Sequence, residues 1–207
     1  MSGIVSQNVG RPSGLIKAAA ATGGGTWVEI KTLTASADST LSFVNGTADV
    51  VLNSTYPVYC FRFVNIHPAS AAHFRFQGSL DTGSNYNVAM TTTVLQTEHS
   101  EAAGGATLTY EGGSDQATGT SFQNLFIGIS NNNDDSGSGY MHLFNPSDTT
   151  FVKHFMFRGS DVSTATATEQ LVGGYFMTTS AIDAVRFEFS TGDIDSGKIK
   201  LFGIKDS

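Results

Sequence analysis

The stretch whose spacing comes nearest to a catalytic motif is "GDIDSGKI", residues 192–199. A glycine, four residues, a second glycine and a lysine begin a phosphate-binding P-loop. A working P-loop continues with Ser or Thr, which holds magnesium, and with a helix whose amides face the phosphate. Here Ile199 follows Lys198, "KIKLFGIK" alternates like a strand, and two aspartates inside the loop would repel a polyphosphate.

We therefore interpret this stretch as a turn between two neighbouring strands. In such a turn the side chains of Asp193 and Ser196 bond to the loop backbone, and Gly197 takes a strained backbone dihedral. The sequence therefore predicts that residues 192–199 are a turn leading into the last strand and not a nucleotide-binding site.

Other catalytic patterns are missing from the sequence. The five histidines show neither HxH nor HExxH spacing, and His142 and His154 fall on adjacent predicted strands without an identifiable third metal ligand. There is no G-x-S-x-G elbow for a nucleophilic serine. The acids that could pair for glycoside hydrolysis lie in a Gly/Ala-rich segment that is typical of a loop. We expect a protein without catalytic residues or cofactors, that is, not an enzyme.

Two sets of residues are candidates for binding. Asn133, Asp134 and Asp135 lie in the oxygen-rich loop "SNNNDDSGSGY", which suits calcium but does not have EF-hand spacing; a solvated loop is the alternative. Tyr86, Tyr110 and Tyr140 border Gly/Asn-rich loops, where their rings could stack on a receptor's sugars; packing at strand ends is the alternative.

Composition excludes several classes of partner. The chain has 207 residues, a formal net charge of −7 and only 14% charged residues. Its Lys and Arg residues are not clustered, so we expect no nucleic-acid binding. No apolar run approaches the roughly 20 residues that span a bilayer, so we expect no membrane insertion. Cys60 is the single cysteine, which excludes an intrachain disulfide and favours a small buried side chain.

The pattern of the chain predicts an all-β fold. Alternation with a period of two indicates about ten strands, separated by polar turn clusters. The predicted strands are 26–33, 56–66, 72–80, 105–112, 121–130, 139–146, 150–159, 170–179, 183–192 and 197–205. The 15 phenylalanines can fill an aromatic core. We predict an antiparallel β-sandwich or jelly roll over residues 26–207, preceded by a short N-terminal arm or linker over residues 1–25.

Four stretches carry a resemblance to a known family. They are "VSQNVGRPSGLIKAA", "YPVYCFRFVNIHP", "GYMHLFNPSDTTFVKHFMFRG" and "SAIDAVRFEFSTGDIDSGKIKLFGIK". Together they resemble small virion structural proteins of tailed bacteriophages, especially marine ones, which pair an "N-x-G-R-x-S-G-x-I-K-A" arm with a β domain. On this resemblance the arm anchors the chain to the particle through Asn8, Arg11, Leu15, Ile16 and Lys17.

The resemblance also implies a location and partners. It implies a protein on the exterior of the virion, in contact with other tail or capsid proteins, forming a homotrimer and touching a host surface glycan. A tail-fibre or host-adhesion component is the leading interpretation. A capsid decoration (cement) protein and a stand-alone carbohydrate-binding module are the alternatives.

Overall fold

The computed structural model describes residues 26–206, which fold into twelve β-strands. Eight strands form one antiparallel sheet in the order β1-β12-β3-β8-β9-β10-β5-β6, and four form a second sheet in the order β2-β11-β4-β7. The strands are β1 (Trp27–Asp38), β2 (Leu41–Val44), β3 (Val58–Pro68), β4 (Ala72–Ser79), β5 (Met90–Ser100), β6 (Ala106–Tyr110), β7 (Gln123–Ile129), β8 (Gly137–Phe144), β9 (Lys153–Val162), β10 (Thr166–Phe176), β11 (Ala184–Phe189) and β12 (Ile194–Ile204).

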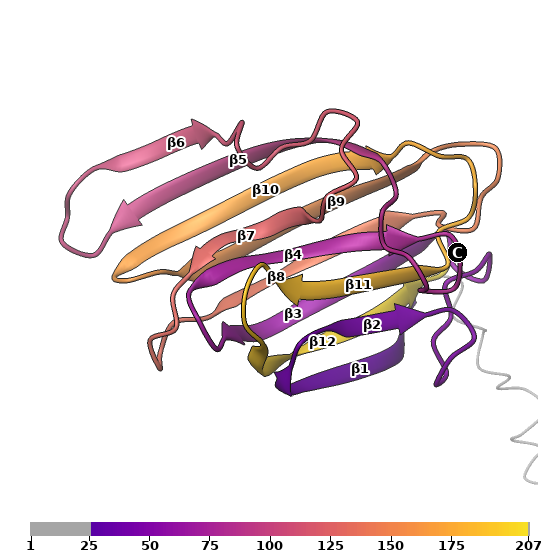
Figure 1. The fold of residues 1–207 in the computed structure, drawn as a ribbon, viewed down its shortest axis with the longest axis horizontal. Coiled ribbons are helices and arrows are strands. Elements are labelled where there is room, and N and C mark those ends of the chain that lie inside the picture. The colour runs from indigo at the N-terminus through magenta and orange to yellow at the C-terminus, as the bar shows by residue number, and fades with distance from the viewer. Residues whose placement is uncertain (1–25, 207) are drawn as a thin grey trace, which may run out of the picture.

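The connectivity is that of a jelly roll with two insertions. The strands β1-β12-β3-β8 and β2-β11-β4-β7 make two four-stranded sheets that face each other, as in an eight-stranded jelly roll built from two Greek keys. The hairpins β5–β6 and β9–β10 are inserted after β4 and after β8, and both extend the larger sheet beyond β8. Figure 1 shows the smaller sheet in front of the larger one, with β5 and β6 extending past its edge at β7. The predicted antiparallel β-sandwich is confirmed, and its strand order matches the jelly-roll alternative.

The two ends of the sandwich differ. At one end lie the longer connections that follow β2, β4, β6, β8 and β10. The chain also enters and leaves the domain there, because the amide of Lys205 donates a 3.4 Å hydrogen bond to the carbonyl of Thr26. Most connections at the opposite end are shorter, and the longest of them is residues 130–136 between β7 and β8. Figure 1 places the C-terminus at the first of these ends.

Phenylalanine rings fill the space between the framework sheets. Inward-facing positions of β3, β4 and β11 supply rings that are almost fully buried, among them Phe61, Phe74 and Phe187. Phe187 stacks on Phe74 with centroids 5.9 Å apart and meets Phe61 edge-on at 5.2 Å. Such pairs add to the free energy gained by burial alone. Tyr59, Phe61 and Phe63 alternate along the predicted strand 56–66, and all three are buried.

Ten of the twelve strands agree with the sequence prediction, and two were missed. β2 has only four residues, too few to show a period. β5 reads "MTTTVLQTEHS", and its buried face includes Thr92 and Gln96. Because these buried positions are polar, the alternation of apolar and polar residues that marks a half-buried strand is lost.

The C-terminal turn is partly as predicted. Gly197 has a φ of +119°, and a Cβ there would lie 2.5 Å from the carbonyl oxygen of Asn65. However, residues 190–193 connect β11 to β12, which belong to opposite sheets, so the prediction of neighbouring strands was wrong. Asp193 uses its backbone carbonyl, which accepts a hydrogen bond from Ala69 at 3.0 Å. Within residues 26–206, the side chains of Asp193 and Ser196 make no hydrogen bond. Lys198 lies on a strand and not at the start of a helix.

Two further expectations concern the ends of the chain and the membrane. The predicted arm, with Asn8, Arg11, Leu15, Ile16 and Lys17, lies outside the described residues. Over residues 26–206 we find no helix with the length and apolar character to cross a bilayer.

Candidate binding face

The outer face of the eight-stranded sheet carries most of the exposed large apolar side chains. In an antiparallel sheet, residues paired across strands point to the same face. The register joins Lys200, Arg62, Tyr140, Arg158, Leu171, Leu95 and Tyr110 into one row that crosses seven strands. Neighbouring rows add Trp27, Met156 and Leu108, the last with 72% of its surface exposed. Exposed apolar patches of this extent mark surfaces that bind a partner.

At one part of this face five side chains form an aromatic platform, defined as Trp27, Arg62, Tyr140, His142 and Phe202. The ring of Trp27 lies 5.8 Å from that of Phe202 and 6.4 Å from that of His142, and Tyr140 lies 5.3 Å from His142. Because β12 and β3 lie between β1 and β8, the Trp27 ring must reach across two strands to meet His142. Trp27 and Tyr140 keep about two fifths of their surface exposed.

Cys60 lies beneath the platform. It points outward, between Phe202 and His142 in the register, yet it is fully buried. Burial raises the pKa of the Cys60 thiol to about 11, although the Arg62 charge opposes this. The cysteine is therefore a neutral packing residue, as the sequence indicated.

Arg62 differs from the other arginines that pack on aromatic rings. Its guanidinium lies 4.8 Å from the Trp27 centroid and 5.7 Å from that of Phe202. On the opposite sheet, Arg75 packs on Phe122 but also pairs with Glu188 at 2.7 Å. Within residues 26–206, Arg62 makes no ion pair and no hydrogen bond to an oxygen, whereas Arg186, stacked on Tyr86, donates one to Ser42 at 3.1 Å. Its N–H groups are thus positioned by stacking and remain available to a ligand.

The outer face has the opposite sign of charge to the rest of the chain. Its strand residues include the four cations Arg62, Arg158, Lys198 and Lys200 and the two anions Glu29 and Glu169. Four positive and two negative charges give +2, against −7 for the whole chain. Both anions are engaged, Glu169 with Arg158 at 2.5 Å and Glu29 with Lys200 at 3.6 Å. The net positive charge therefore comes from Arg62 and Lys198.

His142 is a neutral member of the platform near pH 7. Burial lowers the pKa of His142 below its ordinary value, and the charge of Arg62 lowers it further. His154 lies on the adjacent strand, but the residue directly across from His142 is Met156. Among the described residues there is no group of three His, Cys, Asp or Glu side chains that could hold a metal ion.

The structure separates the three tyrosines that the sequence named as receptor contacts. Tyr140 belongs to the platform, and Tyr110 lies in the same row four strands away, about 19 Å at the usual strand spacing. Tyr110 donates a 2.5 Å hydrogen bond to Asp115. Tyr86 lies by the other sheet, where Arg186 covers its ring at 3.9 Å. Within residues 26–206, Tyr140 alone of the three stands beside an arginine with no oxygen partner, since Arg186 donates a 3.1 Å hydrogen bond to Ser42.

The three loop residues proposed for calcium have different environments. Asp135 is almost buried, and its carboxylate accepts hydrogen bonds from Ser130, from Asn132 at 3.1 Å and from the amide of Thr164 at 3.0 Å. The Ser130 bond, followed by the Thr164 bond, lowers the pKa of Asp135. Asn133 and Asp134 are exposed. These contacts give Asp135 a structural role in closing the loop, and calcium binding stays a prediction.

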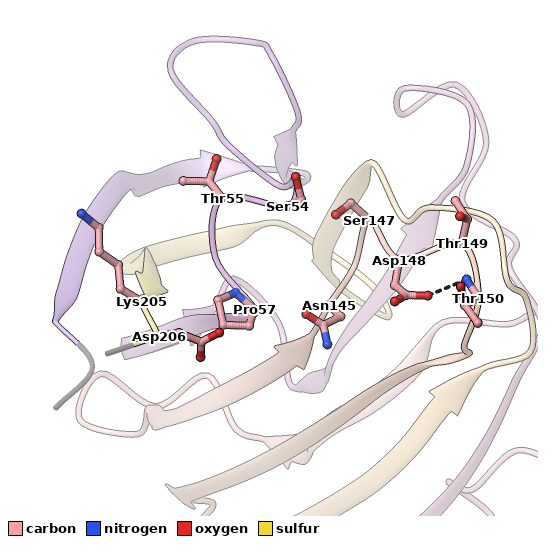
Figure 2. A pocket seen from close by; sticks show the side chains of 10 residues that line it. All are labelled: Ser54, Thr55, Pro57, Asn145, Ser147, Asp148, Thr149, Thr150, Lys205 and Asp206. Atoms are coloured by element: carbon pink, nitrogen blue, oxygen red, sulfur yellow. Dashed lines mark hydrogen bonds between the residues drawn. The ribbon is translucent and has the colours of Figure 1, made fainter.

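A polar hollow of about 660 Å³ lies at the end of the sandwich that carries the termini. Three segments line it, as Figure 2 shows: the β2–β3 connection, the β8–β9 connection and the residues after β12. Asp148 points its carboxylate to its own loop, where it accepts hydrogen bonds from the amides of Thr150 at 2.5 Å and Phe151 at 2.8 Å. These bonds, Phe151's first, lower the pKa of Asp148. Half of the ten residues that line the hollow carry hydroxyl groups, and Lys205 and Asp206 also line it.

Reasoning from the sequence missed three members of the platform, Trp27, Arg62 and Phe202. The alternation of "YPVYCFRFV" did place Arg62 and Cys60 on one face. What the alternation could not reveal is that no strand covers this face within residues 26–206, since that depends on which sheet lies opposite.

Comparison with known proteins gave no match, whether to a protein-family model, a curated protein or a solved structure.

Proposed function

We propose that the chain is a virion structural protein of a tailed bacteriophage. Residues 1–25 anchor it to other tail or capsid proteins, and the jelly-roll domain faces outward on the exterior of the particle as a tail-fibre or host-adhesion component. The proposal rests on the family resemblance of the four sequence stretches. It treats the protein as a binding protein and not an enzyme.

The observation that best supports this role is the placement of the chain ends. Thr26 and Lys205 are hydrogen-bonded at one end of the sandwich, so an anchor made by residues 1–25 joins the domain at that end. The long outer face of the eight-stranded sheet then runs away from the anchor and is exposed along its length. A domain held at one end with an open aromatic face suits adhesion to a surface.

Deleting residues 1–20 tests the anchor. We expect the truncated chain to keep its far-ultraviolet circular dichroism spectrum and melting temperature, and to be lost from purified particles. The matched control is a particle carrying the Lys205→Ala chain, which changes the same end of the domain and leaves residues 1–20 intact. Truncated chain present at normal copy number in the particle would show that the anchor proposal is wrong.

A capsid decoration protein is the second candidate, since the same anchored domain could dock across capsomer joints. Electron microscopy of particles labelled with an antibody to residues 26–206 distinguishes the two: label on the tail supports adhesion, and label spread over the head supports decoration. A stand-alone carbohydrate-binding module predicts glycan binding and no label on the particle.

The resemblance further implies a homotrimer. Sedimentation of the full chain measures this directly. A threefold mass supports the assignment, and a monomer at high concentration contradicts it.

A further inference from the structure

From the platform geometry we infer that it binds an acidic polysaccharide, through a sugar carboxylate on Arg62 and a pyranose ring stacked on Tyr140. This inference rests on the proposed adhesion role and names the chemistry of the host-surface ligand. The ligand class is a chain of pyranose rings that bear carboxylates.

The first argument is the unsatisfied charge of Arg62. Its guanidinium packs against two aromatic rings, at 4.8 Å from Trp27 and 5.7 Å from Phe202, so less side-chain freedom remains to be lost on binding. Within residues 26–206 it has no carboxylate partner. A planar guanidinium with free N–H groups binds carboxylates with two parallel hydrogen bonds.

The second argument is the neighbouring ring. Tyr140 pairs with Arg62 across strands β8 and β3, which places their Cβ atoms about 5 Å apart on the same face. The Tyr140 side chain is 40% exposed, and its other neighbour, His142, is neutral because burial lowers the pKa of His142. One pyranose can therefore lie against Tyr140 while its carboxylate reaches Arg62.

The third argument is the shape and charge of the surroundings. The outer face is a continuous sheet surface, and Lys198 on the neighbouring strand β12 adds a second positive charge that has no ion-pair partner within residues 26–206. A chain with repeated carboxylates fits an open, positively charged face better than a single sugar does. On a chain of net charge −7, this face is where a polyanion meets the least repulsion.

The test uses purified full chain in native gels and calorimetry, with polygalacturonate as the probe. Fully methyl-esterified polygalacturonate is the matched probe, because it keeps the rings and removes the charge. We expect the wild-type chain to bind the acid and not the ester, with binding that weakens as salt increases.

Variants separate the site from general electrostatics. We expect Arg62→Ala to lose about tenfold or more in affinity, as a charge-assisted contact is removed. Arg62→Lys keeps the charge without the planar guanidinium, so its affinity should fall between those of wild type and Arg62→Ala. Tyr140→Ala should lose several-fold in affinity. Arg186→Ala is the control: it removes an arginine stacked on Tyr86 at the opposite sheet and should leave affinity unchanged. Melting temperatures show whether each variant is folded.

Several outcomes would overturn the inference. They are equal binding of the acid and the ester, no binding of either, equal losses in the Arg62 and Arg186 variants, and a change of oligomeric mass in folded Tyr140→Ala that shows the face to be covered by a second copy. Absence of polysaccharide binding in a chain that is still incorporated into particles would refute the ligand and leave the virion role intact.

Discussion

The interior beneath the jelly-roll framework differs from the interior beneath the inserted hairpins, although both lie on the same eight-stranded sheet. Under β3 and β12 the inward positions are aromatic or aliphatic, such as Phe61, Phe63 and Leu201. Under β9, β10 and β5 they become polar toward residues 101–105 and 163–165. The buried polar residues there are Asp161, Thr168, Gln170 and Gln96.

Two buried amides that face the β5–β6 insertion from the smaller sheet have hydrogen-bond partners. Gln123 on β7 accepts a hydrogen bond from Thr92 at 2.7 Å and donates one to the carbonyl of Ser114 at 2.9 Å. Gln77 on β4 donates to the carbonyls of Val88, Thr120 and Ser121 at 3.0–3.2 Å. These hydrogen bonds fix the connections of the β5–β6 insertion to the framework strands. The insertion is therefore positioned by polar contacts, whereas the framework sheets are held together by aromatic packing.

Two of the buried polar residues on β9 and β10 have side-chain oxygens that lack hydrogen-bond partners within residues 26–206. Both carboxylate oxygens of Asp161 and the amide oxygen of Gln170 are buried without a hydrogen-bonding partner among the described residues. Burial raises the pKa of Asp161 to about 6, although Thr168 and Gln170 beside it favour the anion. The difference between the interiors teaches that the framework gains stability from packing, while the inserted hairpins carry groups that cost stability when ionised.

The largest expected effect is in the framework. Phe187→Ala removes a fully buried ring that contacts Phe43, Phe61, Phe63, Phe74 and Phe76, and leaves a cavity. We expect the free energy of unfolding to fall by about 3–5 kcal/mol. Urea unfolding followed by circular dichroism measures this. A loss below about 1 kcal/mol would contradict the assignment of the main core to this cluster.

The second prediction is a gain in stability, in the inserted hairpins. Because the folded-state pKa of Asp161 is raised to about 6, its contribution to stability is fully present below the unfolded-state pKa and is lost as the pH rises from about 4 to 6. Asp161→Asn stays neutral and offers an amide donor to the unpartnered oxygen of Gln170. We expect the variant to be more stable than wild type by about 2–3 kcal/mol at pH 7.5.

The measurement is the melting temperature of both chains between pH 4 and 8. The difference between them should grow through pH 4–6 and then level. Asp134→Asn is a suitable control, because Asp134 is exposed on the adjoining loop and should give no such difference. Equal curves for wild type and Asp161→Asn would show that the carboxylate has partners after all.

The smallest effect is at the edge of the insertion. Tyr110→Phe removes one exposed hydrogen bond to Asp115, and we expect the free energy of unfolding to change by less than about 1 kcal/mol. The same urea titration checks this. A loss comparable to that of Phe187→Ala would mean that β6 is part of the main cooperative core, and the contrast between the two regions would disappear.

The sequence was informative where side chains alternate strongly. Phe61 and Phe63 on β3 and Phe74 and Phe76 on β4 marked their strands and their buried faces correctly. It failed at β5, because Thr92 and Gln96 occupy buried positions and a buried amide is not distinguishable from an exposed one in a sequence. It also grouped Tyr86, Tyr110 and Tyr140 by their loops, whereas register and sheet order set their separation.

The sequence by itself determined that this chain is a β-sandwich with an aromatic core, because period two and turn residues act locally. It also determined that "GDIDSGKI" leads into a strand, since Ile199 and the alternation that follows are local signals. Only the tertiary structure decided that two hairpins extend one sheet, that Trp27 reaches across two strands to meet His142, and that Arg62 lacks a carboxylate partner within residues 26–206. These facts depend on which strands pair, and pairing between distant segments leaves no mark on either segment alone.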